Sequence, residues 1–226
     1  MIATWVNVLG IVVGSLIGLL LKKYISLTLQ DTLLSITSLV VLVIGISGVI
    51  ESNHLIYVIV ALTLGSLMGE ALQVEQRLEK GLYKIEQQFS TNRQEGWFVK
   101  GFISATLLFG IGAMAVVGSF EAGLSQNYEI LYTKATLDFI ASILLAATYG
   151  VGVLFSSVSI LIYQGSLTLL ATSLSTILTP MSIALIGATG SILIIALAFN
   201  MLKLTKFRVS NMLLSLLVAM VFGMFL

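Results

Sequence analysis

VVGSLIGLLLKKYISLTLQDTLLSITSLVVLVIGISGVIESNHLI, at residues 12–56, recurs in diverged form and without a gap at residues 116–160. The two segments are identical at 15 of 45 aligned positions, and each begins with Val-Val-Gly-Ser. Unrelated segments of so apolar a composition would match at about four or five positions. Several matches are at Gly, Tyr and Ser, which agree by chance less often than Leu does. The chain therefore contains an internal repeat, which constrains the architecture before any other feature.

The composition places this repeat in a membrane. The chain has 226 residues, 58% hydrophobic and 9% charged, and its mean hydropathy is +1.09. A soluble domain carries about 25% charged residues, so we expect the lipid bilayer to be the solvent. The net charge of +1 gives no field that would attract nucleic acid. Without Cys and with one His, little room is left for metal chemistry, and we predict neither a metal nor a cofactor.

Stretches of about 20 mostly apolar residues predict transmembrane helices. The first is interpreted as a retained span, because no basic residue precedes it and Lys22 and Lys23 follow it. The repeat separates the fifth span from the sixth at residues 155–158, which align with 51–54, and Pro180 separates the sixth from the seventh. We place eight spans, at residues 2–21, 32–50, 55–74, 98–119, 135–154, 159–178, 181–202 and 211–226.

The predicted fold is therefore all-α and polytopic, with a three-plus-three repeat and two further spans. Its parts are repeat one at 1–74, a linker at 75–97, repeat two at 98–178 and the last two spans at 179–226. In the linker, apolar residues at helical spacing stand among Glu, Arg, Lys and Gln, which predicts an amphipathic cytoplasmic helix on the membrane surface or on the bundle. These apolar residues are Leu78, Leu82, Ile85 and Phe89.

The basic residues indicate the orientation. Ten of the eleven fall in odd-numbered connections between the spans, and only Lys134 falls in an even-numbered one. Basic residues collect on the cytoplasmic side of a membrane. This distribution predicts a multi-pass protein of the cell membrane with both termini outside.

The number of spans in each copy suggests a mechanism. Three is an odd number, so the second copy would enter the membrane from the opposite face and be inverted relative to the first. Inverted repeats are the common plan of secondary transporters, which bind substrate near the bilayer midplane. We therefore favour alternating-access transport of a small ion or solute. The alternatives are an ion channel, with a continuous polar path, and a non-transporting scaffold or interaction protein, with fully packed glycine faces.

Glycines stand at helical spacing in several spans. Gly14 and Gly18 in the first span, and Gly65 and Gly69 in the third, form small faces that favour close helix packing and make a homodimer plausible. The fourth span has three glycines within nine residues; close packing is the default there too, and this span is the stronger candidate for the alternative, a local break of the helix. These glycines are Gly110, Gly112 and Gly118.

Polar side chains inside apolar spans supply a candidate site for substrate or ion. Asp138 is the strongest candidate, since a charge in hydrocarbon is costly and marks a functional position by default. The alternative is an acid near a helix start that pairs with Lys134, four residues earlier. We predict the site between the first, fourth and fifth spans. Its other members are Ser15, Gly118, Ser119, Glu121 and Gln164, with Asn7 and Asn200 as weaker candidates.

Two of these candidates differ between the copies of the repeat. Asp138 aligns with Leu34, and Glu121 aligns with Ile17 deep in the first span. If the two copies of the repeat form a symmetric scaffold, the positions at which the copies differ are those at which functional residues were introduced. For Glu121 the alternative is an acid in an outer loop.

Motifs of soluble enzymes are missing from the sequence. There is no P-loop, no dinucleotide-binding glycine fingerprint, no H-E-x-x-H and no G-x-S-x-G. We therefore predict that the protein is not an enzyme and has no catalytic residues.

Residues 112–119 read Gly-Ala-Met-Ala-Val-Val-Gly-Ser, and Val6-Asn7 and Gly65-x-x-x-Gly69-Glu70 stand before them. Further characteristic positions are Gly123, Leu124, Lys134, Leu137, Asp138, Ser142, Gly152, Val153, Gln164 and Gly165. This pattern resembles the DUF554 family of bacterial integral membrane proteins, which includes the YqgA-like proteins. The resemblance covers essentially the whole chain and departs at Ala3 and at Glu121-Ala122. It implies a multi-pass protein of the bacterial plasma membrane with a transport role, and it supplies no substrate.

Overall fold

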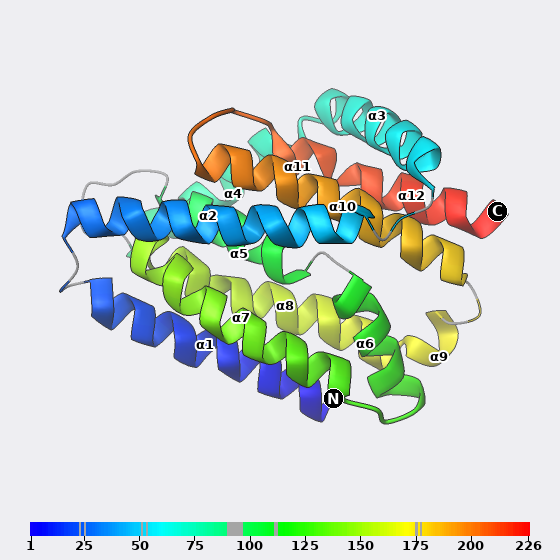
Figure 1. The fold of residues 1–226 in the computed structure, drawn as a ribbon, viewed down its shortest axis with the longest axis horizontal. Helices are drawn as coiled ribbons and strands as arrows, with labels where there is room; N and C mark the ends of the chain where they lie inside the picture. The colour runs from blue at the N-terminus through cyan, green and yellow to red at the C-terminus, as the bar shows by residue number, and fades with distance from the viewer. Residues whose placement is uncertain are drawn as a thin grey trace.

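Helices make up all the regular structure of the residues that the computed structural model describes, which are 1–22, 24, 26–50, 52, 54–89, 97–110, 113–174, 176 and 178–226. Figure 1 shows their order along the chain. The helices are α1 (Ile2–Lys22), α2 (Leu27–Ile50), α3 (Leu55–Ala71), α4 (Val74–Phe89), α5 (Trp97–Gly110), α6 (Ala113–Leu124), α7 (Glu129–Tyr149), α8 (Gly152–Leu169), α9 (Ala171–Leu174), α10 (Pro180–Met201), α11 (Val209–Met212) and α12 (Leu214–Phe225).

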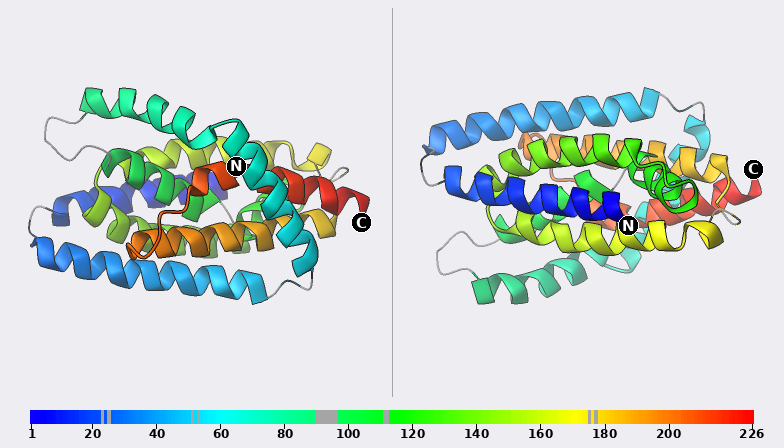
Figure 2. Two further views of the ribbon diagram at one scale, coloured as in Figure 1. Left: turned by 90° about the horizontal axis from the view of Figure 1, so that it is seen from above. Right: turned by 90° about the horizontal axis from the view of Figure 1, so that it is seen from below.

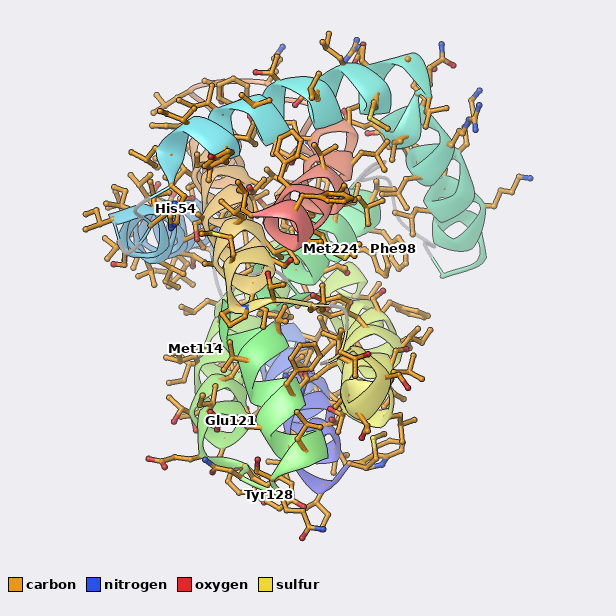
Figure 3. The ribbon with its side chains drawn as sticks, turned by 90° about the vertical axis from the view of Figure 1, so that its right-hand side faces the viewer. His54, Phe98, Met114, Glu121, Tyr128 and Met224 are labelled. Atoms are coloured by element: carbon orange, nitrogen blue, oxygen red, sulfur yellow. The ribbon has the colours of Figure 1, made fainter. Side chains whose placement is uncertain are left out.

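The long helices pack in two groups. The α1 group consists of α1, α5, α6, α7 and α8, and the α10 group consists of α2, α3, α10 and α12. Figure 3 views the bundle from one end, with α1, α6, α7 and α8 in the lower half and the α10 group in the upper half. The longest helices run side by side along the bundle (Figure 2). The α1 group thus contains helices from both copies of the sequence repeat, whereas the α10 group combines α2 and α3 of the first copy with α10 and α12, which follow the second copy.

Among the described residues, five to seven segments are candidate membrane spans by length and composition. Five helices are long and apolar enough to cross a bilayer: α1, α2, α7, α8 and α10. Two bent pairs, α3 with α4 and α5 with α6, each inclined by 57°, raise the number to seven if each pair is one span. In the first pair α3 is the apolar part, because α4 carries charged residues along its length. The predicted count of eight is not confirmed, since residues 209–225 form a shorter apolar segment.

The separation of the sixth and seventh spans at Pro180 is confirmed, and the fourth span has the break for which it was the stronger candidate. Thr179 caps α10, its Oγ1 accepting a hydrogen bond from the Ser182 amide at 3.0 Å, and Pro180 stands at the first helical position, where a missing amide hydrogen costs nothing. The predicted fourth span is broken, with α5 ending at Gly110 and α6 beginning at Ala113. Gly112 of the glycine-rich run lies outside the described residues.

The boundary between the fifth and sixth spans was predicted wrongly. Residues 155–158 lie inside α8 and form no connection. The chain turns earlier, at Gly150, whose φ of +87° is in a region that other residues rarely adopt. Gly152 then packs against the backbone of Phe98, where a side chain would not fit.

Close helix packing at the glycines is confirmed. Gly14 and Gly18 of α1 lie directly against α7, and Gly65 and Gly69 of α3 lie against the backbone around Ser215 and Asn211. A Cβ atom at any of these four glycines would overlap backbone atoms of the facing segment.

The inverted repeat is not confirmed by this packing. Gly14 faces Phe139 and Ser142 of α7, whereas its repeat counterpart Gly118 faces Ile130 and Leu131, also of α7. A two-fold axis relating the copies would place Gly118 against α2, the counterpart of α7. The packing of the two copies therefore differs, although their sequences are related.

The amphipathic linker forms α4, as predicted, and packs on the bundle. Leu82 is 6% exposed and lies in a cluster with Phe98 and Val99 of α5. Leu78 is partly buried against the same cluster, while the side chains of Ile85 and Phe89 lie outside the described residues.

Candidate functional site

A cluster of polar side chains is buried where α1, α7 and α8 meet. Lys134 and Asp138 of α7 form an ion pair, with the lysine Nζ donating to the aspartate Oδ2. Asn7 of α1 donates through Nδ2 to Oε1 of Gln164 on α8, at 2.8 Å. The Asn7 side chain also lies within hydrogen-bonding reach of the Asp138 carboxylate. All four residues are at most 6% exposed.

The local sequence explains why these side chains meet. Lys134 and Asp138 are four residues apart and share one face of α7. Gly10 and Gly14 let α1 lie directly on α7 beside Ala135 and Phe139, which places Asn7 next to the ion pair. Because α8 runs antiparallel to α1, Gln164 reaches Asn7.

A second pair of contacts shows that α8 runs antiparallel to α1. Thr4 and Thr168 lie one turn further along, with 3.4 Å between their hydroxyl oxygens. The polar contacts therefore continue from the Asn7–Gln164 pair toward the N-terminal end of α1. All of them are made by side chains that are buried in the bundle.

Not every polar atom of this region has a partner. Asn7 Oδ1, Gln164 Nε2 and the hydroxyl of Ser15 are buried without a hydrogen bond to any described residue. A buried polar atom without a partner costs about 1–3 kcal/mol. The acceptor on Asn7 and the donor on Gln164 therefore form a place where a polar group of a solute would be stabilised.

The structure brings together only part of the predicted site. Asp138 and Gln164 meet through Asn7, and Ser15 is buried two turns further along α1. Gly118 packs against Ile130 and Leu131 of α7 instead of joining them. The cluster thus lies between the first, fifth and sixth predicted spans, whereas the site was predicted between the first, fourth and fifth.

Ser119 and Glu121 lie on α6, and among the described residues neither side chain forms a hydrogen bond with the cluster. The Ser119 hydroxyl donates to the carbonyl of Ala115 in its own helix at 2.6 Å. Glu121 accepts a hydrogen bond from Asn127 at 2.9 Å, in the connection to α7. Figure 3 shows Glu121 and Tyr128 toward the lower edge of the molecule. α6 packs against α7 and α8, with Ala122 in a cluster with Ala3 and Leu131, and Gly123 against Thr168.

Lys134 occupies a different position from the predicted one. With the fifth span starting at 135 it was assigned to an outer connection, but α7 begins at Glu129 and Lys134 is 5% exposed inside it. Its pairing with Asp138 is the geometry that the structural alternative predicts. Sequence reasoning gave Asn7 little weight, because a single polar residue in a span has no partner that is visible in the sequence.

A cavity of about 520 Å³ lies at the other end of the bundle. Its walls come from the starts of α2 and α5, from α4, and from the ends of α7 and α10 with the connection that follows. Lys203 and Asp31 form an ion pair of 3.2 Å at its mouth, where their side chains are 73% and 70% exposed. The charged residues that line the cavity are Asp31, Glu75, Glu79, Lys100, Lys203 and Lys206.

Apolar residues separate this cavity from the buried cluster. Tyr149, which lines the cavity, is about 16 Å along α7 from Asp138. Leu145 lies between these two positions and is 1% exposed. Ile11 of α1 and Phe109 of α5 belong to the same core cluster and are fully buried. The polar cluster and the open cavity are therefore two compartments with an apolar layer between them.

Comparison with known proteins assigns the family. The profile described as "Protein of unknown function (DUF554)" matches residues 2–224. The chain belongs to the DUF554 family. It is similar to the uncharacterized membrane protein YdfK of Bacillus subtilis (strain 168), with 33% identity over 96% of this chain and 93% of that protein. It is also similar to the uncharacterized protein YqgA of Escherichia coli (strain K12), with 28% identity over 97% and 94%.

No solved structure matches this DUF554 chain. The family and the apolar helices establish a membrane protein, and neither relative carries a described activity. The function therefore has to be argued from the geometry of this chain.

Proposed function

We propose that this DUF554 protein is a secondary transporter of a small ion or solute that works by alternating access. The observation that carries the proposal is the pair of compartments. A cavity open at one end of the bundle is separated by an apolar layer from a buried cluster that contains an intramembrane Lys–Asp pair. A charged pair inside a membrane protein is costly and typically lies on an ion or proton pathway.

The directions of the helices support eight crossings in alternating orientation. Gly10, Gly14 and Gly18 meet α7 at positions of increasing number, so α1 and α7 run parallel. α1 runs antiparallel to α8, and α3 runs antiparallel to α12. These directions are the ones that eight alternating segments would have, with α5 and α6 counted as one segment and α11 and α12 as another.

The basic residues support an inward orientation of the cavity. Lys100, Lys203 and Lys206 line it, and Lys22 lies beside it, with its Nζ 5.4 Å from the ring centroid of Trp97. Basic residues collect on the cytoplasmic side, so the cavity opens toward the cytoplasm in this proposal and both termini lie outside. The described conformation is then the inward-open one, in a bacterial plasma membrane.

The inverted repeat belongs to the same proposal. Related copies in opposite orientations can exchange conformations, which gives inward-open and outward-open states of similar energy. The bend between α5 and α6 supports this mechanism, since broken helices are typical of transporters. We propose no enzymatic activity, and the proposed partners are the lipids of the bilayer, the transported solute and a second copy of the chain.

One observation favours the scaffold alternative. Asp138 is neutralised by Lys134, and the glycine faces are packed, as a purely structural role requires. A channel is less well supported, because the buried layer of Ile11, Phe109 and Leu145 interrupts any continuous polar path.

The proposal is tested by flux into proteoliposomes against a panel of ions and small metabolites. We expect the wild-type protein to move at least one solute faster than empty liposomes, and Asp138→Asn to reduce that flux at least tenfold. Glu129→Gln, at the exposed start of the same helix and outside the cavity, is the matched control and should retain flux. Equal flux in wild type and Asp138→Asn would remove Asp138 from the mechanism.

A further inference from the structure

The charges that line the open cavity are segregated by element. Glu75 and Glu79 stand on α4, whereas Lys100 stands on α5 and Lys206 in the connection after α10. Among the described residues, Glu79, Lys100 and Lys206 form no ion pair. The cavity thus has the carboxylates of Glu75 and Glu79 on one wall and the ammonium groups of Lys100 and Lys206 on two others. In the part of the chain that the structure describes, these carboxylates and ammonium groups do not pair with one another.

Glu75 is held in place by the backbone. Its amide donates to Oδ1 of Asn211 at 2.7 Å, and its carboxylate accepts from the backbone of Ser210. The nearby cation Arg208 is already paired with Glu70. Burial raises the pKa of Glu75, and the charge of Glu79 adds to this effect. The site therefore has a fixed carboxylate that a cationic group of a ligand would stabilise.

The remaining walls of the cavity are apolar and aromatic. Trp97 and Tyr149 lie with their ring centroids 5.8 Å apart, and both line the cavity. Leu34 of α2 and Leu197 of α10 contribute further apolar surface. A cavity of about 520 Å³ is within the range of small-molecule sites.

We propose that this cavity binds a small zwitterion with an apolar body. The ammonium group lies against Glu75 and Glu79, the anionic group against Lys100 and Lys206, and the apolar body against Trp97 and Tyr149. A simple anion would face the two carboxylates without compensation, and a metal cation would face the lysines. Free amino acids with apolar side chains carry this chemistry, and so do ethanolamine phospholipids. The role of such a ligand as transported substrate rests on the proposed function, but its binding does not.

Binding is tested with the fluorescence of Trp97. The chain has two Trp residues, and Trp5→Phe leaves Trp97 as the single reporter. The purified full-length variant in detergent micelles is titrated with L-leucine and, in a second arm, with dihexanoyl phosphatidylethanolamine. We expect saturable binding in at least one arm. N-acetyl-L-leucine and L-leucinamide, or dihexanoyl phosphatidic acid in the lipid arm, each lack one charge and should bind at least tenfold more weakly.

Charge-removing variants locate the site. Lys100→Gln and Glu79→Gln should each weaken binding at least tenfold, and Lys206→Gln supplies a second test of the cationic wall if Lys100→Gln does not fold. Lys84→Gln, on the exposed part of α4, and Glu129→Gln, at the exposed start of α7, are matched controls that should bind as wild type does.

Several outcomes would overturn the zwitterion site. The first is the lack of saturable binding in either arm. The second is equal binding of the zwitterions and of the ligands that lack one charge. The third is a loss of binding in the control variants equal to that in the variants of the cavity. The proposed transport activity is judged separately. Flux that depends on Asp138 without zwitterion binding would support the proposed transport activity and reject the zwitterion as ligand. Zwitterion binding without flux would support the binding site and reject the transport activity.

Discussion

Lys134 and Asp138 show how one pair of residues allows two interpretations. Each is at most 6% exposed, and each would be a costly unpaired charge if the other were removed. Asn7 bonds to Gln164 and lies beside the carboxylate, so residues of three helices meet at the pair. A structural role and a transport role make different predictions for substitutions at this pair.

Removal of one partner should destabilise the fold strongly. We expect Asp138→Leu to cost about 3–5 kcal/mol in the free energy of unfolding, because it leaves Lys134 buried and unpaired. The double variant with Lys134→Met and Asp138→Leu should return close to wild-type stability, since apolar side chains of similar volume often replace a buried pair without loss. Thermal unfolding in detergent measures both effects. A double variant as unstable as the single one would contradict this account.

The exposed pair between Lys203 and Asp31 is the control for this comparison. Because both side chains are about 70% exposed, Asp31→Asn should change the free energy of unfolding by about 0–1 kcal/mol.

At the scale of residues, the sequence indicated Asp138 and Gln164 but not the contact between them. A charge in an apolar span is visible in the sequence, whereas Asn7 gains its role only because α1 and α8 pack antiparallel. Ser119 and Glu121 were predicted to join the site, but the Ser119 hydroxyl bonds within its own helix and Glu121 bonds to Asn127. Hydropathy does not encode such partners.

At the scale of helices, turn chemistry predicted the ends better than the repeat did. Pro180 and its cap Thr179 fix the start of α10 as expected. The end of α7 was predicted about five residues too late, because it was taken from the aligned end of α2 in the first copy of the repeat. The glycine pair at Gly150 and Gly152 was the better signal, since a positive φ ends a helix.

The glycine face of α1 gives a prediction at this scale. Gly14→Ala would force a Cβ atom against the backbone of Phe139 and the hydroxyl of Ser142, and we expect it to destabilise the protein by about 1–3 kcal/mol. Gly81→Ala in α4 is the control, because nothing lies within 4 Å of its added carbon, and it should stabilise the helix by up to about 1 kcal/mol. Thermal unfolding of both variants checks the pair. Wild-type stability of Gly14→Ala would show that α1 and α7 are less closely packed than described.

At the scale of the whole molecule, composition predicted a helical membrane protein, and the family and the helices confirm it. The sequence repeat predicted a symmetry that the helix contacts do not reproduce, because Gly14 and Gly118 both pack against α7. Contacts between distant helices decide how the copies assemble, and a repeat found in the sequence contains no information about them.

The proposed orientation can be tested by labelling, since the chain has no Cys. A membrane-impermeant maleimide added to whole cells should label Asn127→Cys, in the exposed connection between α6 and α7. It should label Lys84→Cys, on the exposed part of α4, only after the membrane is opened. Labelling of both variants from the same side would contradict the alternating arrangement of the spans.

We propose that the buried pair serves transport and does not merely hold α7 in the fold. The decisive measurement is solute flux into proteoliposomes by the double variant with Lys134→Met and Asp138→Leu, for a solute that the wild-type protein moves. The account predicts a folded protein of near wild-type stability whose flux falls to that of empty liposomes. Flux equal to that of the wild type would contradict it and leave the pair with a structural role alone.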